Sequence, residues 1–340
     1  MKKIIILLIL LLFFLNCGYF TLRTYKEWLE KSDGKDSVIY AAGYYNFGGG
    51  VEQACYWKIK DNDIDLVFLP GALNSRAYSL FVFDDNIYTC GQNGSQACYW
   101  INDKLYELEN SLPISSNAWS INVHNGIIYV AGYYSTGGHG QACYWVNGKL
   151  YNLEKKGTSS EAKSIFFEDN RFSDIYIAGS YYSGSYYSCY WKNGNLFDLP
   201  AAANSRGNSI FVINSNIDIA GFDGSSYGYW DNNNFITLKP VPGGNAQTSD
   251  SVYIYDKDIY VAGSAAGGPH AVYWKNNQPV ELESVISSAA SICVYDSDVY
   301  VAGWYTGGGI ACYWKNGSRV DLDSGQALSI YIARIKDVTR

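Results

Sequence analysis

The residues in this sequence that could do chemistry are mainly aromatic. Tyrosine occurs 32 times among 340 residues, and aromatic residues make up 16% of the chain against 17% for charged residues. Aromatic pairs follow an Ala-Gly step at four places: Tyr44-Tyr45, Tyr133-Tyr134, Tyr181-Tyr182 and Trp304-Tyr305. Flat aromatic rings beside Gly, Ser and Thr loops offer a large contact area at low entropic cost. This pattern predicts a surface that binds a glycan or a protein.

In the other copies different residues follow the equivalent glycine, namely Gln92-Asn93, Phe222-Asp223 and Ser264-Ala265. A purely structural tyrosine would recur at every copy, so the uneven use favours a binding role. Two interpretations stay open for each pair. The first ring either packs against its neighbours or joins the surface, and we expect the second ring to be exposed.

Four further residues are candidates for the same surface. Tyr78 and Trp119 stand at the entry to two equivalent segments, where we expect them near a central axis. Arg76 and Arg206 each end the repeated sequence Asn-Ser-Arg, so we expect them to occupy equivalent positions in their repeats. Arginine beside aromatic rings is frequent in binding hot spots.

Acid-base and metal chemistry have few candidates. The three histidines, His124, His139 and His270, fall in different parts of the chain, so we expect no shared metal ion. The segment 61–65 has alternating aspartates but lacks the downstream Gly and Glu of a calcium loop. A glycosidase would need two carboxylates about 5–9.5 Å apart, and only Asp223 and Asp250 are candidates near the axis. The sequence therefore predicts no metal, no cofactor and no catalytic residue.

Seven of the eight cysteines lie in the body of the chain. Five share one position, two residues before a tryptophan: Cys55, Cys98, Cys143, Cys189 and Cys312. Gly228 and Val272 take that position in the other copies, which indicates a site for a small apolar residue. No CxxC spacing suggests zinc, although a disulfide between one pair of cysteines stays open.

These residues are carried by seven copies of one unit, about 43 residues long. Its tryptophan recurs at Trp57, Trp100, Trp145, Trp191, Trp230, Trp274 and Trp314. Each copy has a Ser-Ile-x-Val run, an Ile-Tyr-Val-Ala-Gly run, a Tyr-Trp run and a closing run that ends in leucine. Tight Asn-Gly turns at Asn147, Asn193 and Asn316 separate the last two runs. Four short strands per unit predict an all-β, seven-bladed β-propeller of four-stranded blades over 37–340.

The two ends of this region predict how the ring closes. The first copy begins at its second strand, Val38 to Gly43, and the chain ends on an unpaired first strand, Ala327 to Arg334. Pairing of these segments would complete blade one and hide the sheet edges. A solenoid is the competing architecture, but it would need capping repeats at both ends.

The repeats resemble the HAF extracellular-repeat family, in which a glycine-ended strand precedes an aromatic-Trp-x-x-Gly turn and a closing leucine. Gly132, Trp145, Gly148 and Leu153 carry this likeness in one copy, and it extends over roughly 37–334. The Tyr-Trp and Ala-Gly pairs differ from the residues that this family usually has at these positions. The resemblance implies an extracytoplasmic propeller but no particular activity.

The N-terminus reads as an export signal. Lys2 and Lys3 precede an apolar run from Ile4 to Leu15, which is short for a membrane-spanning helix of about 20 residues. Phe14-Leu15-Asn16-Cys17 resembles the lipobox of bacterial lipoproteins, although Phe14 and Asn16 depart from the strict pattern. The resemblance implies a signal peptide at 1–16, a lipidated Cys17 and a tether at 17–36. An ordinary signal peptide or an uncleaved anchor stays open.

The net charge of −7 and the lack of a basic stripe do not suit a nucleic-acid partner. We expect a monomeric propeller in the cell envelope, periplasmic or on the surface, with a lipid anchor in the membrane and a protein or glycan ligand. The alternatives are a carbohydrate-active enzyme, either a glycosidase or a lyase, and a structural scaffold of an envelope complex. Because propellers host many activities, the fold does not decide among these.

Overall fold

Each repeat of the sequence forms antiparallel strands in the computed structural model, which describes residues 37–109, 115–168, 174–242, 244–265, 270–306 and 309–334. The predicted signal peptide, Cys17 and the tether lie outside the described residues. A compact unit spans Val38–Ala333, and the described part of the chain consists of strands and turns without helices. Accordingly, no described helix is long and apolar enough to cross a membrane.

Five sheets have four strands each, arranged in chain order. The first sheet is β4 (Arg76–Phe83), β5 (Asn86–Asn93), β6 (Gln96–Ile101) and β7 (Lys104–Glu107). The second is β8 (Ser115–His124), β9 (Ile127–Ser135), β10 (Gly140–Val146) and β11 (Lys149–Asn152). The third is β12 (Ser159–Phe167), β13 (Ile175–Tyr182), β14 (Tyr186–Lys192) and β15 (Asn195–Asp198). The fourth is β16 (Arg206–Ile213), β17 (Asn216–Phe222), β18 (Tyr227–Asp231) and β19 (Asn234–Thr237). The fifth is β20 (Ser251–Tyr255), β21 (Asp258–Ala265), β22 (His270–Lys275) and β23 (Gln278–Glu281).

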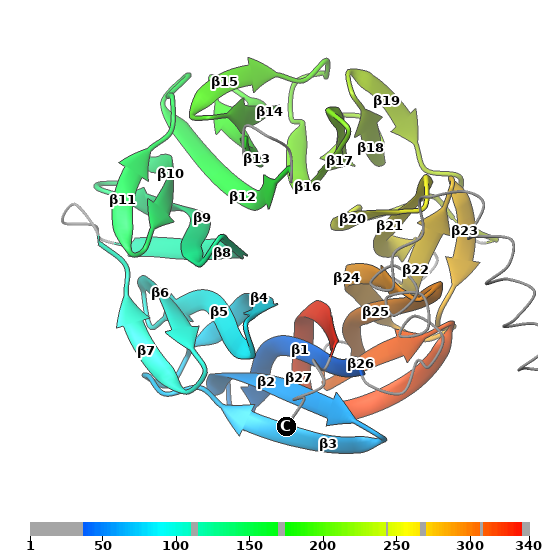
Figure 1. Cartoon of the computed structure of the whole chain (residues 1–340). Coiled ribbons are helices and arrows are strands. Elements are labelled where there is room, and N and C mark those ends of the chain that lie inside the picture. Colours follow the sequence, from blue (N-terminus) through cyan, green and yellow to red (C-terminus); the bar gives the residue numbers. More distant parts are fainter. Residues whose placement is uncertain are drawn as a thin grey trace, which may run out of the picture. The chain divides into compact units, whose positions relative to one another are not determined.

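The sixth sheet joins the two ends of the described chain. Its strands are β24 (Ser287–Tyr295), β25 (Asp298–Tyr305), β26 (Ile310–Lys315), β27 (Ser318–Arg334), β1 (Ser37–Asn46), β2 (Glu52–Lys60) and β3 (Asp63–Phe68), in that order. The 17-residue β27 pairs with β26 through its first part and is the sheet neighbour of β1. Figure 1 shows the sheets arranged around a common centre, with β4, β8, β12, β16, β20 and β24 innermost. The fold is therefore an all-β, propeller-like repeat fold, as the sequence predicted.

The tryptophans fill the space between neighbouring sheets. All seven repeat tryptophans are fully buried. Trp145 Nε1 donates a hydrogen bond, 2.6 Å long, to the carbonyl oxygen of Glu109, in the segment before the sheet that contains Trp145. Trp191 Nε1 donates in the same way to the carbonyl oxygen of Glu154, at 2.9 Å. Five of the seven rings donate to a backbone carbonyl oxygen of the segment that leaves the preceding sheet. Trp314 bonds the Glu283 carboxylate instead, and Trp57 Nε1 has no partner among the described residues. The repeat tryptophans are therefore packing residues between sheets.

The glycine of the Ala-Gly step lets two strands approach closely. A Cβ built on Gly132 would lie 1.9 Å from the carbonyl oxygen of Asn117 on the adjacent strand, and one on Gly91 would lie 1.9 Å from that of Arg76. No side chain fits at such distances, so only glycine allows this strand spacing. The repeated glycine is therefore a steric requirement of this strand pairing.

The turns and the cysteines also match their predictions. Asn147 and Gly148 both have positive φ, 48° and 85°, as a tight two-residue hairpin requires. The seven described cysteines are free thiols and all are buried. Burial raises the pKa of the Cys143 thiol well above its ordinary value. These cysteines are buried packing residues in the described structure.

Serine hydroxyls link the innermost strands. Ser79 Oγ accepts a hydrogen bond from the backbone N–H of Ile121 at 3.2 Å, and Ser120 Oγ accepts one from Ile165 at 3.1 Å. The same bond recurs between neighbouring strands, where the backbone N–H groups of Ile210, Val252, Ile292, Ile330 and Leu80 donate to the hydroxyl oxygens of Ser164, Ser209, Ser251, Ser291 and Ser329, respectively. The serine that opens each Ser-Ile-x-Val run is therefore a contact between sheets.

Candidate functional site

The innermost strands carry β-bulges at one repeated position. In five sheets the register shifts by one residue just before the repeat serine. The extra residues are Tyr78, Trp119, Lys163, Asn208 and Ala290. A bulge leaves its extra residue out of the strand ladder and re-aims its side chain. The five bulge residues, which differ from repeat to repeat, therefore lie on the innermost strands, where neighbouring sheets meet.

Side chains at these bulges contact one another from sheet to sheet. The rings of Tyr78 and Trp119 have centroids 4.4 Å apart. The Lys163 ammonium lies 3.7 Å from the Trp119 ring centroid and forms an ion pair with Glu161. A cation over a tryptophan face is favourable by about 0.5–2 kcal/mol. The prediction that Tyr78 and Trp119 lie close to the axis agrees with these contacts.

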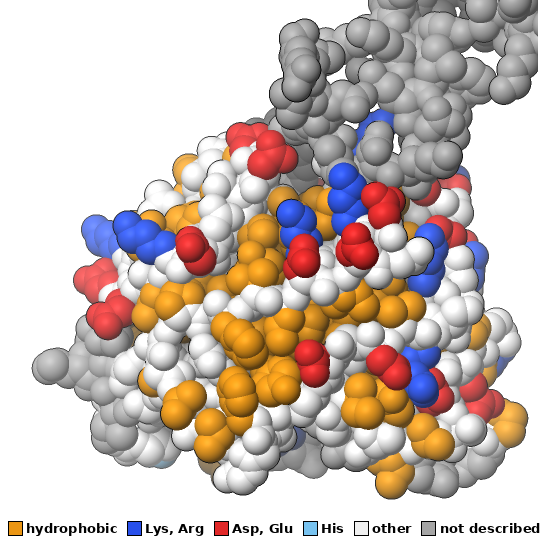
Figure 2. Space-filling view, turned by 90° about the horizontal axis from the view of Figure 1, so that it is seen from below, with side chains coloured by type: hydrophobic (Ala, Val, Ile, Leu, Met, Phe, Trp, Pro, Cys, Tyr) orange, Lys and Arg blue, Asp and Glu red, His pale blue; other side chains and the backbone are white. Residues whose placement is uncertain are grey.

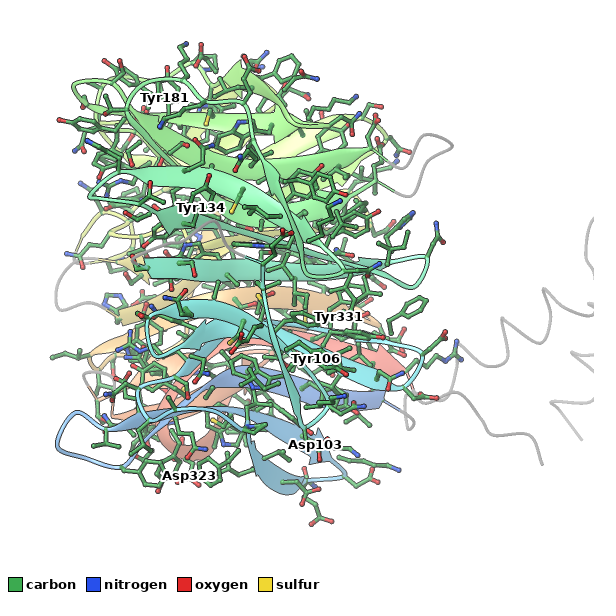
Figure 3. The ribbon with its side chains drawn as sticks, turned by 90° about the vertical axis from the view of Figure 1, so that its left-hand side faces the viewer. Asp103, Tyr106, Tyr134, Tyr181, Asp323 and Tyr331 are labelled. Atoms are coloured by element: carbon green, nitrogen blue, oxygen red, sulfur yellow. The ribbon has the colours of Figure 1, made fainter. Side chains whose placement is uncertain are left out.

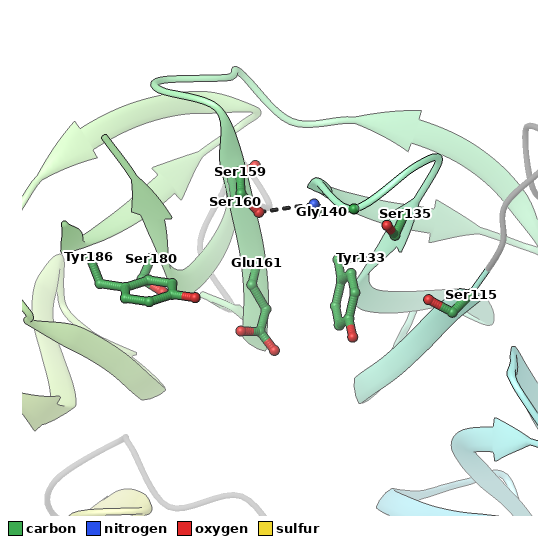
Figure 4. A pocket seen from close by; sticks show the side chains of 10 residues that line it. Ser115, Tyr133, Ser135, Gly140, Ser159, Ser160, Glu161, Ser180 and Tyr186 are labelled. Atoms are coloured by element: carbon green, nitrogen blue, oxygen red, sulfur yellow. Dashed lines mark hydrogen bonds between the residues drawn. The ribbon is translucent and has the colours of Figure 1, made fainter. Parts of the chain in front are cut away.

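A pocket opens beside this cluster, between the sheets of β8–β11 and β12–β15. It has a volume of about 280 Å³. Its lining residues are Ser115, Tyr133, Ser135, Gly138, Gly140, Ser159, Ser160, Glu161, Ser180 and Tyr186. Figure 4 shows the Glu161 carboxylate between the rings of Tyr133 and Tyr186. The volume is close to the lower end of the range for ligand pockets, about 300–1,000 Å³.

The pocket combines flat aromatic walls with hydrogen-bonding groups. Ser159 Oγ accepts a bond from the Gly140 N–H at 2.9 Å, while Ser160 Oγ accepts one from Ala142 at 3.0 Å. These bonds hold β10 against β12. Glu161 reaches the surface, since its side chain is 30% exposed, and the Tyr186 ring is exposed at 37%. A small polar ligand with an apolar face would match this lining.

Two polar atoms beside the pocket lack partners among the described residues. They are Asn117 Oδ1 and Trp119 Nε1, and both are buried. Asn117 Nδ2 donates to the hydroxyl of Tyr133, a pocket residue, at 3.0 Å. A buried acceptor or donor without a partner costs about 1–3 kcal/mol. A bound ligand or water that reaches these atoms would recover that cost.

The two predicted arginines occupy equivalent places, each over a tyrosine ring of the preceding sheet. The Arg76 guanidinium lies 4.8 Å from the Tyr44 ring centroid, and that of Arg206 lies 4.4 Å from the Tyr186 ring centroid. Arg76 also forms an ion pair with Glu52 at 2.5 Å. Arg206 thus supports one wall of the pocket, whereas Arg76 belongs to a neutralised pair.

The aromatic pairs divide between packing and surface. Tyr44 and Tyr181 are buried, 6% and 5% exposed, so for these two the packing interpretation holds. Among the second rings, Tyr182 is exposed, at 37%. The other three are less exposed and fall in the intermediate range: Tyr45, Tyr134 and Tyr305. Exposure of the second ring was therefore predicted too broadly. Tyr133 is the pair member that lines the pocket, and Trp304 is partly buried in β25.

Hydrogen bonds hold several of these tyrosines against the outer strands. The Tyr134 hydroxyl donates to Asn152 at 3.1 Å, the Tyr181 hydroxyl to Asp198 at 3.0 Å and the Tyr305 hydroxyl to Asp321 at 3.0 Å. Figure 3 shows Tyr134 and Tyr181 toward one face of the unit, and Asp103 and Tyr106 toward the other. Tyr134 and Tyr181 therefore lie toward the same face.

A separate apolar group surrounds Tyr45. Its ring centroid lies 4.7 Å from that of Phe47 and 5.5 Å from that of Phe68, and both phenylalanines are exposed, at 54% and 41%. Figure 2 shows apolar side chains gathered across the side of the molecule that carries β3. Phe47 and Phe68 were missed in the sequence because neither belongs to the recurring aromatic pair.

The two carboxylates proposed for glycoside cleavage differ in their surroundings. Burial raises the pKa of Asp250 to about 6, against a weaker opposing hydrogen bond from Thr248. Burial acts in the same direction on Asp223, but hydrogen bonds from Ser226 and Ser225 outweigh it and hold its pKa below the ordinary value. Asp223 Oδ1 accepts from the backbone N–H groups of Ser225 and Ser226 at 2.8 and 2.7 Å. Asp223 therefore stabilises its own turn.

The sequence analysis missed Glu161, Lys163 and Tyr186. The signal for the first two was available, because they stand three and one residues before a repeat serine, where other copies carry Arg76 and Tyr78. Tyr186 lies in a third strand, in a part of the repeat whose variation was not considered. The described residues contain no group of three His, Cys, Asp or Glu side chains placed to hold a metal ion.

The sequence matches no family model. Two cowpox virus proteins, both Kelch repeat and BTB domain-containing protein 2 from the Brighton Red and GRI-90 strains, are 32% and 31% identical over 103 residues. The match covers 28% of this chain and 18% of each viral protein. The chain therefore spans less than a fifth of the length of these relatives.

Solved structures similar to this chain include two bacterial proteins. A putative 6-phosphogluconolactonase from Bacteroides fragilis superposes with a TM-score of 0.53 at 12% identity, over 89% of this chain and 99% of that one. A periplasmic gluconolactonase from Pseudomonas aeruginosa gives a TM-score of 0.51 at 11% identity, over 88% of this chain and 100% of that one. At such low identity the similarity concerns the fold alone, and it supports the propeller architecture.

Proposed function

We propose that this chain is an extracytoplasmic binding module that holds a terminal sugar of a glycan in the pocket between β8–β11 and β12–β15. The observation that carries the proposal is the pocket itself, with Tyr133 and Tyr186 as its walls and Glu161 between them. Aromatic faces pack on the apolar side of a sugar ring, and serine hydroxyls and a carboxylate bond its hydroxyl groups. The unpartnered Asn117 Oδ1 adds a nearby acceptor.

A glycan array probed with soluble protein from residue 18 onward tests this function. Wild-type protein should bind a subset of glycans, and the Tyr133→Ala/Tyr186→Ala variant should lose about 100-fold or more in affinity, since two stacking walls disappear. The matched control is Tyr134→Ala/Phe197→Ala, which removes two aromatic rings from the same two sheets outside the pocket lining.

The control variant should bind as the wild type does. Equal loss in both double variants would place the site elsewhere on this face. A wild-type protein that binds no glycan would contradict the proposal and favour a protein ligand or a scaffold role.

A carbohydrate-active enzyme is the second candidate, and the position of Glu161 in the pocket favours it. Glycoside hydrolysis commonly uses two carboxylates, but Glu161 is the one carboxylate among the described residues that line the pocket. Glu161 Oε1 already forms an ion pair with the Lys163 ammonium. Binding without cleavage is therefore our preferred function. Hydrolysis of an array glycan that Glu161→Gln abolishes would establish an enzyme instead.

The proposed architecture is a closed ring of seven blades. β27 supplies the fourth strand of blade seven and the first strand of blade one, which supports this count. The serine bonds that join β27 to β24 and to β4 support closure, because they continue the same contact used between all other innermost strands. The ring would place every Ala-Gly loop on the face that holds the pocket.

The proposed location is the cell envelope, with a lipid on Cys17 as membrane anchor. Its basis is the resemblance of Phe14-Leu15-Asn16-Cys17 to the lipobox. Two or more acyl chains, at about 0.8 kcal/mol per buried methylene, anchor a protein stably. Full-length protein should partition into detergent, and Cys17→Ser protein should stay in the aqueous phase. Detergent partitioning by Cys17→Ser would show an uncleaved apolar anchor.

A further inference from the structure

The sheet of β16–β19 lacks a lysine that three other sheets share. In these three, a tyrosine of the second strand faces a lysine of the third in register: Tyr176 with Lys192, Tyr260 with Lys275 and Tyr300 with Lys315. The lysine ammonium lies 5.1–5.3 Å from the tyrosine ring centroid. It also forms an ion pair with an aspartate at the start of the second strand, at 2.8 or 2.9 Å: Asp174, Asp258 or Asp298.

An asparagine completes each of these groups. Asn193, Asn276 and Asn316 each donate from Nδ2 to the same aspartate, at 2.7 or 2.8 Å. Aspartate and lysine balance in charge, so the group is neutral. Its ammonium lies over the tyrosine ring and beside the aspartate carboxylate.

The fourth sheet replaces three of the four members. Asn216 stands at the aspartate position, Asp218 at the tyrosine position and Asp231 at the lysine position, while Asn232 is retained. Asp218 and Asp231 face each other in register, so two carboxylates replace the pair of ring and ammonium. The group now carries two negative charges and no positive one. Like charges directly opposite on a sheet are destabilising.

The carboxylates are close together and incompletely bonded. Asn216 Nδ2 donates to Asp218 Oδ2 at 2.9 Å and to Asp231 Oδ1 at 3.2 Å, so a single atom lies near both. Asp218 is 1% exposed, and its Oδ1 atom has no hydrogen-bond partner among the described residues. A buried carboxylate oxygen without a partner needs a donor or a cation.

We propose that a hard divalent cation, Ca²⁺ in particular, binds between Asp218 and Asp231 in the place that a lysine ammonium takes in three other sheets. Both aspartates supply carboxylate oxygens, and the cation takes the place of Asn216 Nδ2, the donor that lies near both of them. Asn216 Oδ1 accepts a hydrogen bond from Asn232 Nδ2. Ca²⁺ takes six to eight oxygen ligands in flexible geometry, and water completes the set because Asp231 and Asn216 are partly exposed. The cation restores the charge balance of the group and joins β17 to β18.

This site is distinct from the glycan pocket. Asn216 follows the turn between the first two strands of its sheet, and Asp231 precedes the turn between the last two. The pocket is lined instead from the loop between second and third strands, at Gly138 and Gly140. These connections emerge at opposite faces, so the cation would stabilise the fold without taking part in glycan binding.

Thermal unfolding of the soluble chain, freed of metal with EDTA and then titrated with CaCl₂, tests the proposal. We expect Ca²⁺ to raise the melting temperature by a few degrees, because a ligand that binds only the folded state stabilises it. Asp218→Asn should abolish this rise. Asp258→Asn is the matched control, since it removes an aspartate from the equivalent group of the fifth sheet, and it should keep the Ca²⁺ response.

A second variant guards against simple misfolding of Asp218→Asn. Asn216→Asp/Asp218→Tyr/Asp231→Lys rebuilds the neutral group of the other sheets, and it should melt in EDTA as high as wild-type protein does in Ca²⁺. Terbium luminescence sensitised by the adjacent Tyr229 and Trp230 should appear with wild-type protein and vanish with this variant. A wild-type melting temperature unaffected by Ca²⁺, or terbium luminescence equal in the two proteins, would overturn the proposal.

Discussion

Single residues decide how tightly the strands of each sheet can pack. Gly132 is the clearest case, because a Cβ there would lie 1.9 Å from the carbonyl oxygen of Asn117. Asn117 also bonds Tyr133, so the same strand contact positions one wall of the pocket. Residues of this kind were recognisable in the sequence because a steric requirement is identical in every repeat.

Gly132→Ala should destabilise the fold by about 3 kcal/mol, since the strands must separate to admit the methyl group. Gly309→Ala is the control, because its Cβ would meet only Thr306, at 3.4 Å or more. It should change the free energy of unfolding by less than about 0.5 kcal/mol. Urea unfolding followed by tryptophan fluorescence measures both, and equal stability of the two variants would contradict the steric account.

Asp250 should make stability depend on pH. Its folded-state pKa of about 6 lies above the ordinary value of 3.8 because burial disfavours the charged form. The folded state therefore binds the proton more tightly than the unfolded chain does. The resulting penalty is complete above about pH 6 and disappears as the pH falls toward 4.

Asp250→Asn should therefore stabilise the protein by about 1–3 kcal/mol at pH 7.5. The gain should shrink as the pH is lowered from 6 to 4, where wild-type Asp250 becomes neutral. Melting temperatures across this range test the expectation. A gain that is constant with pH, or that grows toward acid pH, would show that the Asp250 carboxylate is not destabilised by burial.

At the scale of strands and sheets, the residues that recur in every repeat determine the fold, and the residues that differ between repeats form the candidate site. The strands, the hairpin turns and the buried tryptophans were predicted because they recur with one spacing. The pocket could not be predicted in the same way, since Glu161 and Tyr186 reach it from different strands and meet Tyr133 of another sheet. These residues come together only because the two sheets pack side by side.

The bulges and the carboxylate pair illustrate the same limit. At Trp119 the alternation of buried and partly exposed residues breaks, since Trp119 and Ser120 are both partly exposed. Only the strand register identifies Trp119 as the bulged residue. Asp218 and Asp231 are separated by 13 positions in sequence order, and they become neighbours only through strand register. A comparison of each repeat position across all copies would have identified the bulge residues and the two aspartates as positions that differ between repeats.

The contact between innermost strands depends on the repeat serine. Ser120→Ala removes the acceptor of the Ile165 N–H and should cost about 1–2 kcal/mol. Ser183→Ala, in an exposed turn, should have no measurable effect. Chemical denaturation compares the two. If Ser120→Ala were as stable as wild-type protein, the serine hydroxyls would not be needed to hold the sheets together.

At the scale of the whole molecule, one strand connects the ends of the chain. β27 lies between β26 and β1 in the sheet order, and Ser329 and Ile330 of this strand bond to β4 and β24. Ala327 and Ile330 pack in the same core cluster as Ala41 and Trp57. The stability of every sheet should therefore depend on a segment near the end of the sequence.

The most direct test of the closed ring is the melting temperature of protein that lacks residues 328–340. Loss of the second half of β27 should lower it by more than about 10 °C or prevent folding, because β1, β4 and β24 lose a neighbour at once. Deletion of residues 335–340 alone leaves β27 whole and serves as the control, with a change of a few degrees at most. An unchanged melting temperature in the longer deletion would contradict the closed seven-bladed ring on which the proposed binding face rests.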